Sequence, residues 1–202
     1  MLVRELMTRR VVTASPETPV KEALRRLAER EVTAMPVVDH AGALVGVVSE
    51  ADLIRDLVVP DQRAHELPVH VGTGPWPKRV GEVMSNFPLS VRADADLTVA
   101  VELMTGSAAK SLPVLEDGVV VGVISRRDVV AVLARGDDRI EAEVDELLRS
   151  AELSCTVHVA DGVVQVEGLA DRHQQELATV LATTVRGVVG VRFDGTFPHT
   201  GI

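Results

Sequence analysis

Residues 42–52 read GALVGVVSEAD, and residues 118–128 read GVVVGVISRRD. Three residues of the first segment, Gly46, Ser49 and Asp52, therefore recur in the second as Gly122, Ser125 and Asp128. A recurrence over this length indicates two similar structural units that pack together. The first two thirds of the chain are thus predicted to form a paired fold.

The residues that precede these two segments align as well. Residues 82–104 align with residues 5–27 at an offset of 77 without a gap, and the offset becomes 76 because the second copy omits one residue near Ala41. One unit has therefore been duplicated and shortened by a single residue in a turn.

Each copy begins with the same predicted elements. A short extended piece, Val11–Thr13 or Leu89–Val91, precedes a helix whose apolar residues follow the spacing i, i+3, i+4, i+7. We expect Thr18 and Pro19 to be the N-cap and first residue of the first helix, and Asp96 to cap the second. The apolar stripes are Val20, Ala23, Leu24 and Leu27 in copy one, and Leu97, Ala100, Val101 and Met104 in copy two.

A hairpin and a final helix complete each copy. The predicted strands are 35–38 and 44–48 in copy one, and 112–115 and 119–124 in copy two. Ser49 and Ser125 each open the final helix. The order is β-α-β-β-α twice, an α+β fold in which the copies form a pseudo-two-fold pair. Residues 60–79 carry four Pro and two Gly without periodicity, and we predict that they link the copies.

Three features of each copy resemble the cystathionine-beta-synthase (CBS) domain. They are the opening Met7-Thr8 or Met84-Ser85, the x-Pro-Val strand, and the Gly-h-h-Ser-x-x-Asp ending, where h is an apolar residue. The resemblance implies a Bateman module of two CBS domains, residues 1–59 and 80–135. It also implies a regulatory, non-enzymatic protein.

The recurring Ser-x-x-Asp has two interpretations. A hydroxyl at the N-cap and a carboxylate in the first turn stabilise a helix without any ligand. Alternatively, pairing of the copies brings both helix starts to a common cleft. There a carboxylate can accept hydrogen bonds from the two hydroxyls of a ribose, and free N–H groups can face a phosphate.

The CBS resemblance implies two adenine-nucleotide sites, in which this Asp binds ribose and apolar strand residues hold the adenine. The expected ligand is ATP, ADP, AMP or S-adenosylmethionine, acting as a regulator and not as a required cofactor. Each site combines the Ser/Asp ending of one copy with strand residues of the other. One site would contain Ser125, Arg126 and Asp128 with Thr13, Thr33, Ala34 and Met35; the other would contain Ser49 and Asp52 with Ser90, Lys110, Ser111 and Leu112.

The two predicted sites differ in charge. Lys110 and Arg126 of copy two correspond to Thr33 and Glu50 of copy one. A positive side chain stabilises a bound phosphate, whereas Glu50 would oppose a polyphosphate. For Arg126 the alternative is a solvated position at the start of a helix.

Residues 137–202 follow a different pattern, and their predicted order is α-β-β-α-β. This order, with GVVQVEG (residues 162–168) at its centre and GVVGV (residues 187–191) near its end, resembles the BON domain, which implies phospholipid binding. The predicted features are a helix with Ile140, Val144, Leu147 and Leu148 on one face, capped by Asp137 or Asp138; a hairpin of 156–159 and 163–167 around Ala160-Asp161-Gly162; a helix with Leu177, Val180, Leu181 and Thr184 on one face; and a strand through Val188, Val191 and Phe193.

Charge and composition argue against several functions. The net charge is −9, and residues 137–202 hold 5 basic against 12 acidic side chains, so the tail would repel nucleic acid and anionic membranes. One Trp, three Phe and no Tyr leave few platforms for base stacking. Neither a metal-ligand pattern nor a catalytic constellation is found in the sequence. Cys155 is the single cysteine, and we expect it to pack rather than react.

We therefore expect a soluble, cytoplasmic homodimer that senses an adenine nucleotide and regulates a partner protein in trans. The opening residues MLVRELMTRR have no apolar segment of the kind that targets a chain for export. The alternative is a structural or interaction scaffold, in which the CBS clefts are empty and the BON-like domain docks to lipid or protein.

Overall fold

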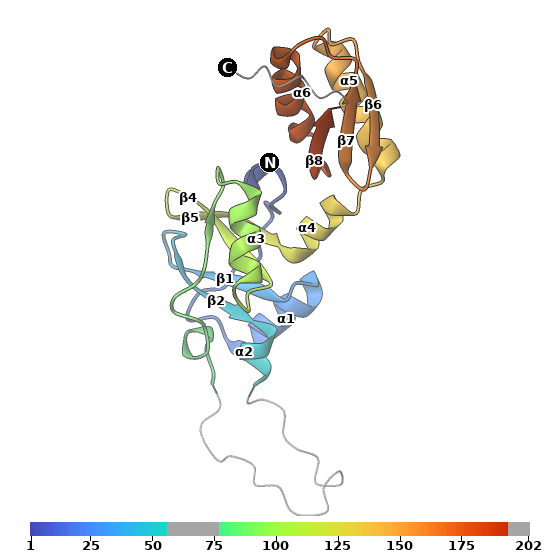
Figure 1. Ribbon diagram of the computed structural model, residues 1–202. Helices are drawn as coiled ribbons and strands as arrows, with labels where there is room; N and C mark the ends of the chain where they lie inside the picture. Colours follow the sequence, from blue (N-terminus) through green and yellow to red (C-terminus); the bar gives the residue numbers. More distant parts are fainter. Residues whose placement is uncertain (56–76, 194–202) are drawn as a thin grey trace, which may run out of the picture. The chain divides into compact units, whose positions relative to one another are not determined.

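The computed structural model describes residues 1–55 and 77–193, which form two compact units (Figure 1). The first unit is Leu2–Arg126, which contains both copies of the repeat. The second unit begins at Arg127, inside helix α4 (Arg126–Leu133), and holds the tail. No helix within these described ranges has both the length and the apolar character required to cross a bilayer.

The first unit has the predicted order of elements in both copies. Copy one contains α1 (Val20–Arg30), β1 (Ala34–Val38), β2 (Leu44–Ser49) and α2 (Glu50–Ile54). Copy two contains β3 (Val91–Arg92), α3 (Leu97–Thr105), β4 (Ser111–Glu116), β5 (Val119–Ser125) and the first residue of α4. Both hairpins are antiparallel. Strand β3 joins β4 in parallel, and in copy one the matching contact is a single parallel bridge between Ala14 and Val37.

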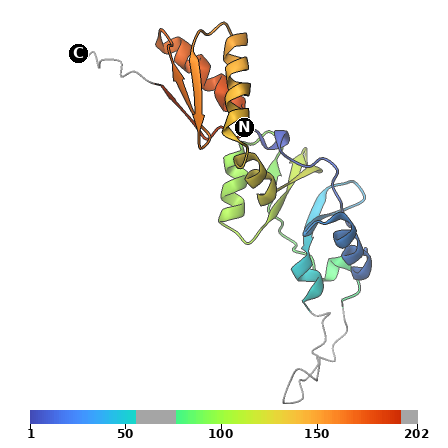
Figure 2. The same cartoon turned by 90° about the vertical axis from the view of Figure 1, so that its right-hand side faces the viewer.

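The apolar stripe of α1 packs on its own hairpin, as the periodicity predicts. Val20, Ala23 and Leu27 are buried in one core with the strand residues Met35 and Val37. In copy two, Ala100 and Met104 are buried in the same way. Figure 2 shows the strands of the two hairpins lying between α1 on one side and α3 on the other.

Of the two predicted helix caps in this unit, one is confirmed and one is wrong. The Asp96 carboxylate accepts a hydrogen bond from the Thr98 N–H at 2.9 Å, and this bond lowers the pKa of Asp96. The N-cap of α1 is Pro19 and not Thr18. The Thr18 hydroxyl instead accepts from the Ser15 N–H at 2.9 Å and closes the preceding turn, so it is not available to the helix.

The opening segment of each copy packs on the other copy, an exchange that we did not predict from the sequence. Thr8 of copy one forms an antiparallel bridge with Val123 of β5, and Ser85 of copy two forms one with Val47 of β2. The short 3₁₀ helices that precede these residues, η1 (Val3–Glu5) and η3 (Val80–Glu82), each bury one valine completely. Each sheet is therefore completed by residues that belong to the other repeat.

The exchange includes the end of the predicted linker. The Val20 N–H donates to the Lys78 carbonyl at 3.0 Å, and Arg79 bridges Pro19. Lys78 and Arg79 thus belong to the folded unit, while residues 60–76 of the predicted linker lie outside the described residues.

The two recurring glycines are required by this exchange. A Cβ atom on Gly46 would lie 2.8 Å from Met84 Sδ and 2.8 Å from the Ser85 carbonyl oxygen. A Cβ atom on Gly122 would lie 2.5 Å from Met7 Sδ. The glycines of the repeat therefore accommodate the methionines that open the opposite copy.

The second unit has the predicted α-β-β-α-β order. Its elements are α5 (Asp137–Ser150), β6 (Thr156–Ala160), β7 (Val163–Glu167), α6 (Arg172–Thr184) and β8 (Gly190–Phe193). The strands pair in the order β6-β7-β8, with β7 and β8 parallel. Alternate residues of β6 and β7 are buried in one core with α5, so a single face of the sheet is covered. The strand β8 begins at Gly190, and Val188 precedes it.

The predicted apolar face of α6 is only partly buried: Leu181 packs against the core, whereas Thr184 is exposed. Leu177 and Val180 are exposed, whereas Ala178 and Ala182 are fully buried in the core. Small side chains let a helix approach its neighbours closely, and α6 turns its alanines toward the core. Leu177 and Val180 consequently form an apolar surface on α6.

The predicted cap of α5 by Asp137 or Asp138 is wrong, since Gly136 is the N-cap. The Asp137 carboxylate instead accepts hydrogen bonds from two backbone N–H groups of the β6–β7 turn, those of Asp161 at 2.8 Å and Gly162 at 2.9 Å. The predicted Asp-Gly turn is thus held by a side chain 24 residues earlier in the chain.

We predict that Asp137→Ala destabilises the second unit by about 1–3 kcal/mol, because two backbone donors lose a charged acceptor. Asp138→Ala is the matched control, since Asp138 is exposed and also lies in the first turn of α5. Urea unfolding followed by circular dichroism measures both variants. Equal effects of the two substitutions would contradict the role assigned to Asp137.

Candidate functional site

A pocket of about 530 Å³ lies in the first unit and is lined by residues of both copies. This volume falls within the range of small-molecule sites. Copy one contributes the start of β1, part of β2 and the start of α2; copy two contributes the segment after η3 and the loop before β4. The lining residues are Thr33, Ala34, Val47, Ser49, Glu50, Ala51 and Asp52 from copy one, and Ser85, Phe87, Pro88, Leu89, Ser107, Ala108, Ala109, Lys110 and Ser111 from copy two.

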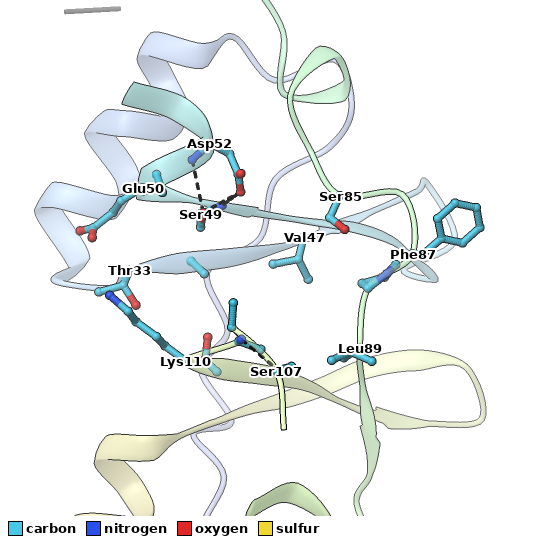
Figure 3. Close-up of a pocket in the computed structure, with 16 residues that line it drawn as sticks. Thr33, Val47, Ser49, Glu50, Asp52, Ser85, Phe87, Leu89, Ser107 and Lys110 are labelled. Carbon is cyan, nitrogen blue, oxygen red and sulfur yellow. Dashed lines mark hydrogen bonds between the residues drawn. The ribbon is translucent and has the colours of Figure 1, made fainter. Parts of the chain in front are cut away.

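Ser49 and Asp52 form a reciprocal cap at the start of α2 (Figure 3). The Ser49 hydroxyl donates to Asp52 Oδ2 at 2.6 Å, and the Ser49 N–H donates to the same oxygen at 2.9 Å. The Asp52 N–H donates to Ser49 Oγ at 3.3 Å. The cap thus engages Oδ2, while Oδ1 lies 3.9 Å from Arg55, and the Asp52 side chain keeps 27% of its area exposed. The structural interpretation of Ser-x-x-Asp is therefore confirmed in copy one, and the same carboxylate still lines the pocket.

Much of the pocket wall is aliphatic. Ala34, Val47 and Leu89 line it, and Figure 3 shows Val47 and Leu89 on opposite walls. Phe87 also lines the pocket, but it is 94% exposed and its ring points away from the other labelled side chains. A flat ligand here would be held between aliphatic side chains.

Three charged side chains line the pocket among the residues that the structure describes, namely Glu50, Asp52 and Lys110. Figure 3 shows Glu50, Thr33 and Lys110 together at one side of it. The backbone is equivalent in the two copies, because the Glu50 N–H donates to the Thr33 carbonyl and the Arg126 N–H donates to the Lys110 carbonyl, each at 3.0 Å. The two copies therefore share this hydrogen bond but differ in charge, because Thr33 and Glu50 of copy one correspond to Lys110 and Arg126 of copy two.

Arg126 is engaged with the end of α3. Its guanidinium donates to the carbonyl oxygens of Met104 and Ser107, the latter at 3.2 Å. A positive charge at the C-terminus of a helix is electrostatically favourable. This arrangement differs from both sequence-based interpretations of Arg126, a phosphate ligand and a solvated helix start. It fixes a loop whose residues Ser107 and Lys110 line the pocket.

The pocket brings together four residues of the site predicted around Ser49: Ser49 itself, Asp52, Lys110 and Ser111. Two other residues of that prediction do not line it. Leu112 is fully buried, and Leu89 lines the pocket in place of its neighbour Ser90.

Residues predicted for the other site are distributed differently. Thr33 and Ala34 line the pocket that contains Ser49, because the hydrogen bond from Glu50 ties Thr33 to the helix start of its own copy. Met35 is fully buried. Thr13 lines a separate hollow of about 290 Å³ with Arg26 and His40. Ser125 ends β5, and Asp128 belongs to the second unit, so the site predicted around them stays a prediction.

Sequence reasoning missed Ser85 and Ser107 as lining residues. Ser85 reaches the pocket through the exchange of opening segments, and Ser107 through its place after α3. The local sequence around Ser85 and Ser107 does not predict either contact. Elsewhere, burial raises the pKa of the Cys155 thiol, which favours packing over reactivity.

Comparison with known proteins identifies the repeat. The family model for the CBS domain matches residues 3–59 and 80–135. The chloroplastic CBS domain-containing protein CBSX2 of Arabidopsis thaliana is 33% identical over 132 residues, which cover 57% of this chain and 55% of that protein. The chain thus spans about half the length of this relative. The A-adding tRNA nucleotidyltransferase of Aquifex aeolicus is 31% identical over 128 residues, which cover 63% of this chain and only 14% of the enzyme.

Solved structures agree with this result. The crystal structure of CBSX2 in complex with AMP has a TM-score of 0.55 and 30% identity, and the match covers 64% of this chain and 94% of that one. The CBS domain pair of protein MJ0100, in complex with 5′-methylthioadenosine and S-adenosyl-L-methionine, has a TM-score of 0.54 at 22% identity over 65% of this chain and 94% of that one, a likeness of fold. The matched ranges contain both copies of the repeat and cover more than half of the chain. This chain therefore belongs to the CBS domain family and carries the domain as a tandem pair.

Proposed function

We propose that this protein is a non-enzymatic regulator whose CBS pair binds an adenine nucleotide or an adenosyl derivative in the pocket that contains Ser49. The observation that carries the proposal is the Asp52 carboxylate, held by Ser49 at the edge of a 530 Å³ pocket that also contains Lys110.

Each part of an adenine nucleotide has a suitable partner in this pocket. The Asp52 carboxylate can accept hydrogen bonds from ribose hydroxyls, and bonds to a charged acceptor are among the stronger ones. The aliphatic side chains of Ala34, Val47 and Leu89 suit the faces of a purine. Lys110 supplies a positive charge for a phosphate. The complex of CBSX2 with AMP supports a ligand of this class.

Regulation requires that the ligand favours one arrangement of the protein over another, because equal affinity for both changes nothing. We propose that the ligand acts on a partner protein in trans or on the second unit. We also propose a homodimer, supported by exposed apolar side chains such as Ile54 and Val99. Light scattering measures the mass, and a monomer at tens of micromolar would contradict the dimer.

Calorimetric titration with ATP, ADP, AMP and S-adenosylmethionine tests ligand binding. We expect saturable binding of at least one of them, and no binding of UMP, which carries ribose and phosphate without a purine. Failure of all four adenosyl compounds would refute the proposal.

A second candidate function is a docking scaffold. The exposed Leu177 and Val180 of α6 favour it, since apolar side chains on a helix surface are typical of contact sites. The tail would then be the BON-like module that contacts lipid or protein. Its acidity predicts weak binding to anionic vesicles, which co-sedimentation with liposomes measures.

A further inference from the structure

The charged groups of the pocket limit the ligands that it can accept. Glu50, Asp52 and Lys110 give the lining a formal charge of −1 among the described residues. Arg55 lies 3.9 Å from Asp52 Oδ1 and is largely exposed, so it offsets that carboxylate only weakly. Lys110 is the single described cation that lines the pocket itself.

Arg126, the other cation attached to this wall, is already engaged. Its guanidinium donates to the carbonyl oxygens of Met104 and Ser107. To reach a phosphate in the pocket it would have to give up these bonds at the end of α3. Among the described residues that line the pocket, one cation, Lys110, is therefore available to pair with a phosphate.

Glu50 lies where additional phosphates would extend. Figure 3 shows Glu50, Thr33 and Lys110 at one side of the pocket, away from Val47 and Leu89. With the base against the aliphatic residues and the ribose at Asp52, the phosphate end of a nucleotide falls between Lys110 and Glu50. A first phosphate can pair with Lys110, whereas each further phosphate adds negative charge near Glu50 without another cation to balance it.

We propose that this pocket selects adenosyl ligands with at most one phosphate, and that Glu50 is the residue that disfavours ADP and ATP. This inference rests on the proposed function, because it assumes an adenosyl ligand in the pocket. It adds a specificity that the CBS fold does not dictate, since the equivalent position in copy two is Arg126.

The repeat itself supplies matched variants for the test. Glu50→Arg gives copy one the residue of copy two, and Lys110→Thr gives copy two the residue of copy one. Glu17→Arg is the control for charge, because Glu17 is exposed and lines the separate hollow near Thr13. Adenosine, AMP, ADP and ATP are titrated into each full-length protein at low and at high salt.

For the wild type we expect AMP to bind most tightly and ATP about tenfold more weakly, with the difference shrinking at high salt. Glu50→Arg should raise the affinity for ATP about tenfold relative to AMP and leave adenosine unchanged. Lys110→Thr should lower the affinity for AMP by about fivefold and again leave adenosine unchanged. Glu17→Arg should match the wild type for all four ligands.

The outcomes separate the two proposals. If the wild type binds none of these four compounds and does not bind S-adenosylmethionine either, both proposals fail. If it binds adenosine or AMP but ATP equally well, or if Glu50→Arg leaves the ratio of ATP to AMP affinity unchanged, the charge selection is refuted and nucleotide binding stands. Thermal unfolding of each variant should match the wild type, because the replaced side chains are exposed, and a match excludes misfolding as the cause.

Discussion

Replacing either glycine of the repeat by alanine is expected to destabilise the CBS pair by about 1–3 kcal/mol, because the added methyl group overpacks the contact between the copies. On Gly46 the new Cβ would lie 2.8 Å from Met84 Sδ and from the Ser85 carbonyl oxygen. That oxygen accepts a hydrogen bond from the Val47 N–H at 3.2 Å, so it cannot move without weakening the bridge. On Gly122 the close atoms all belong to the Met7 side chain.

The added methyl group meets a backbone oxygen at Gly46 but only side-chain atoms at Gly122, so shortening the opposing methionine should relieve the two variants to different extents. Met7→Ala removes the two closest atoms at Gly122, Met7 Sδ and Cγ, and leaves Met7 Cβ at 3.2 Å. Gly122→Ala and Met7→Ala together should therefore be more stable than the sum of their separate effects by about 1 kcal/mol or more. Combining Gly46→Ala with Met84→Ala should recover less, because the Ser85 oxygen remains. Urea unfolding of each single and double variant measures the two coupling energies.

Gly190→Ala serves as the control, since a Cβ atom there would meet nothing within 4 Å. We expect its effect on stability to stay within about 0.5 kcal/mol. If Gly46→Ala and Gly122→Ala were as neutral as this control, the exchange of opening segments between the copies would be wrong.

The second large effect is expected for Asp52→Asn. The amide has nearly the shape of the carboxylate but lacks its charge, and its oxygen can still accept from the Ser49 N–H. The substitution deprives two ribose hydroxyls of a charged acceptor, so we expect the affinity for the adenosyl ligand to fall by about 10- to 100-fold. The loss of stability should be about 1 kcal/mol or less, as is usual for a changed helix cap.

Calorimetric titration and thermal unfolding of the same samples separate the two roles of Asp52. Glu17→Gln changes the net charge equally and is expected to bind as the wild type does. If Asp52→Asn bound the ligand normally while losing stability, the carboxylate would be only a helix cap, and the pocket would hold its ligand by other groups.

Patterns between neighbouring residues predicted most of the local structure. The stripe of α1 and the two hairpins followed from the spacing of apolar residues, and Asp96 followed from its place before a helix. The predicted Thr18 cap was wrong because the preceding turn uses the Thr18 hydroxyl, and the Thr18 backbone is engaged as well. Thr18 bonds to Ser15, and its carbonyl accepts from Val80 of the other copy.

The predicted Ser49 site shows the same distinction between local and long-range contacts. Ser49 and Asp52 are three residues apart, so their reciprocal hydrogen bonds are a local property of a helix start. Lys110 came from the resemblance to the CBS family, and the structure brings it to the same pocket. Ser85 was not found, since it reaches the pocket through the exchange between copies, and Leu89 was not found because its neighbour Ser90 was predicted in its place.

The amino-acid sequence by itself determined the duplicated β-α-β-β-α unit, the order of elements in the tail and the cap at Ser49, because periodicity and caps act over a few residues. The tertiary structure alone decided that Met7 and Met84 pack on the glycines of the opposite copies, and that Glu50 and Lys110 line the same pocket. The residues in these contacts lie 38 positions apart for Gly46 and Met84, 60 for Glu50 and Lys110, and 115 for Met7 and Gly122. At such separations the packing of the two copies, and not any local preference, selects the partners.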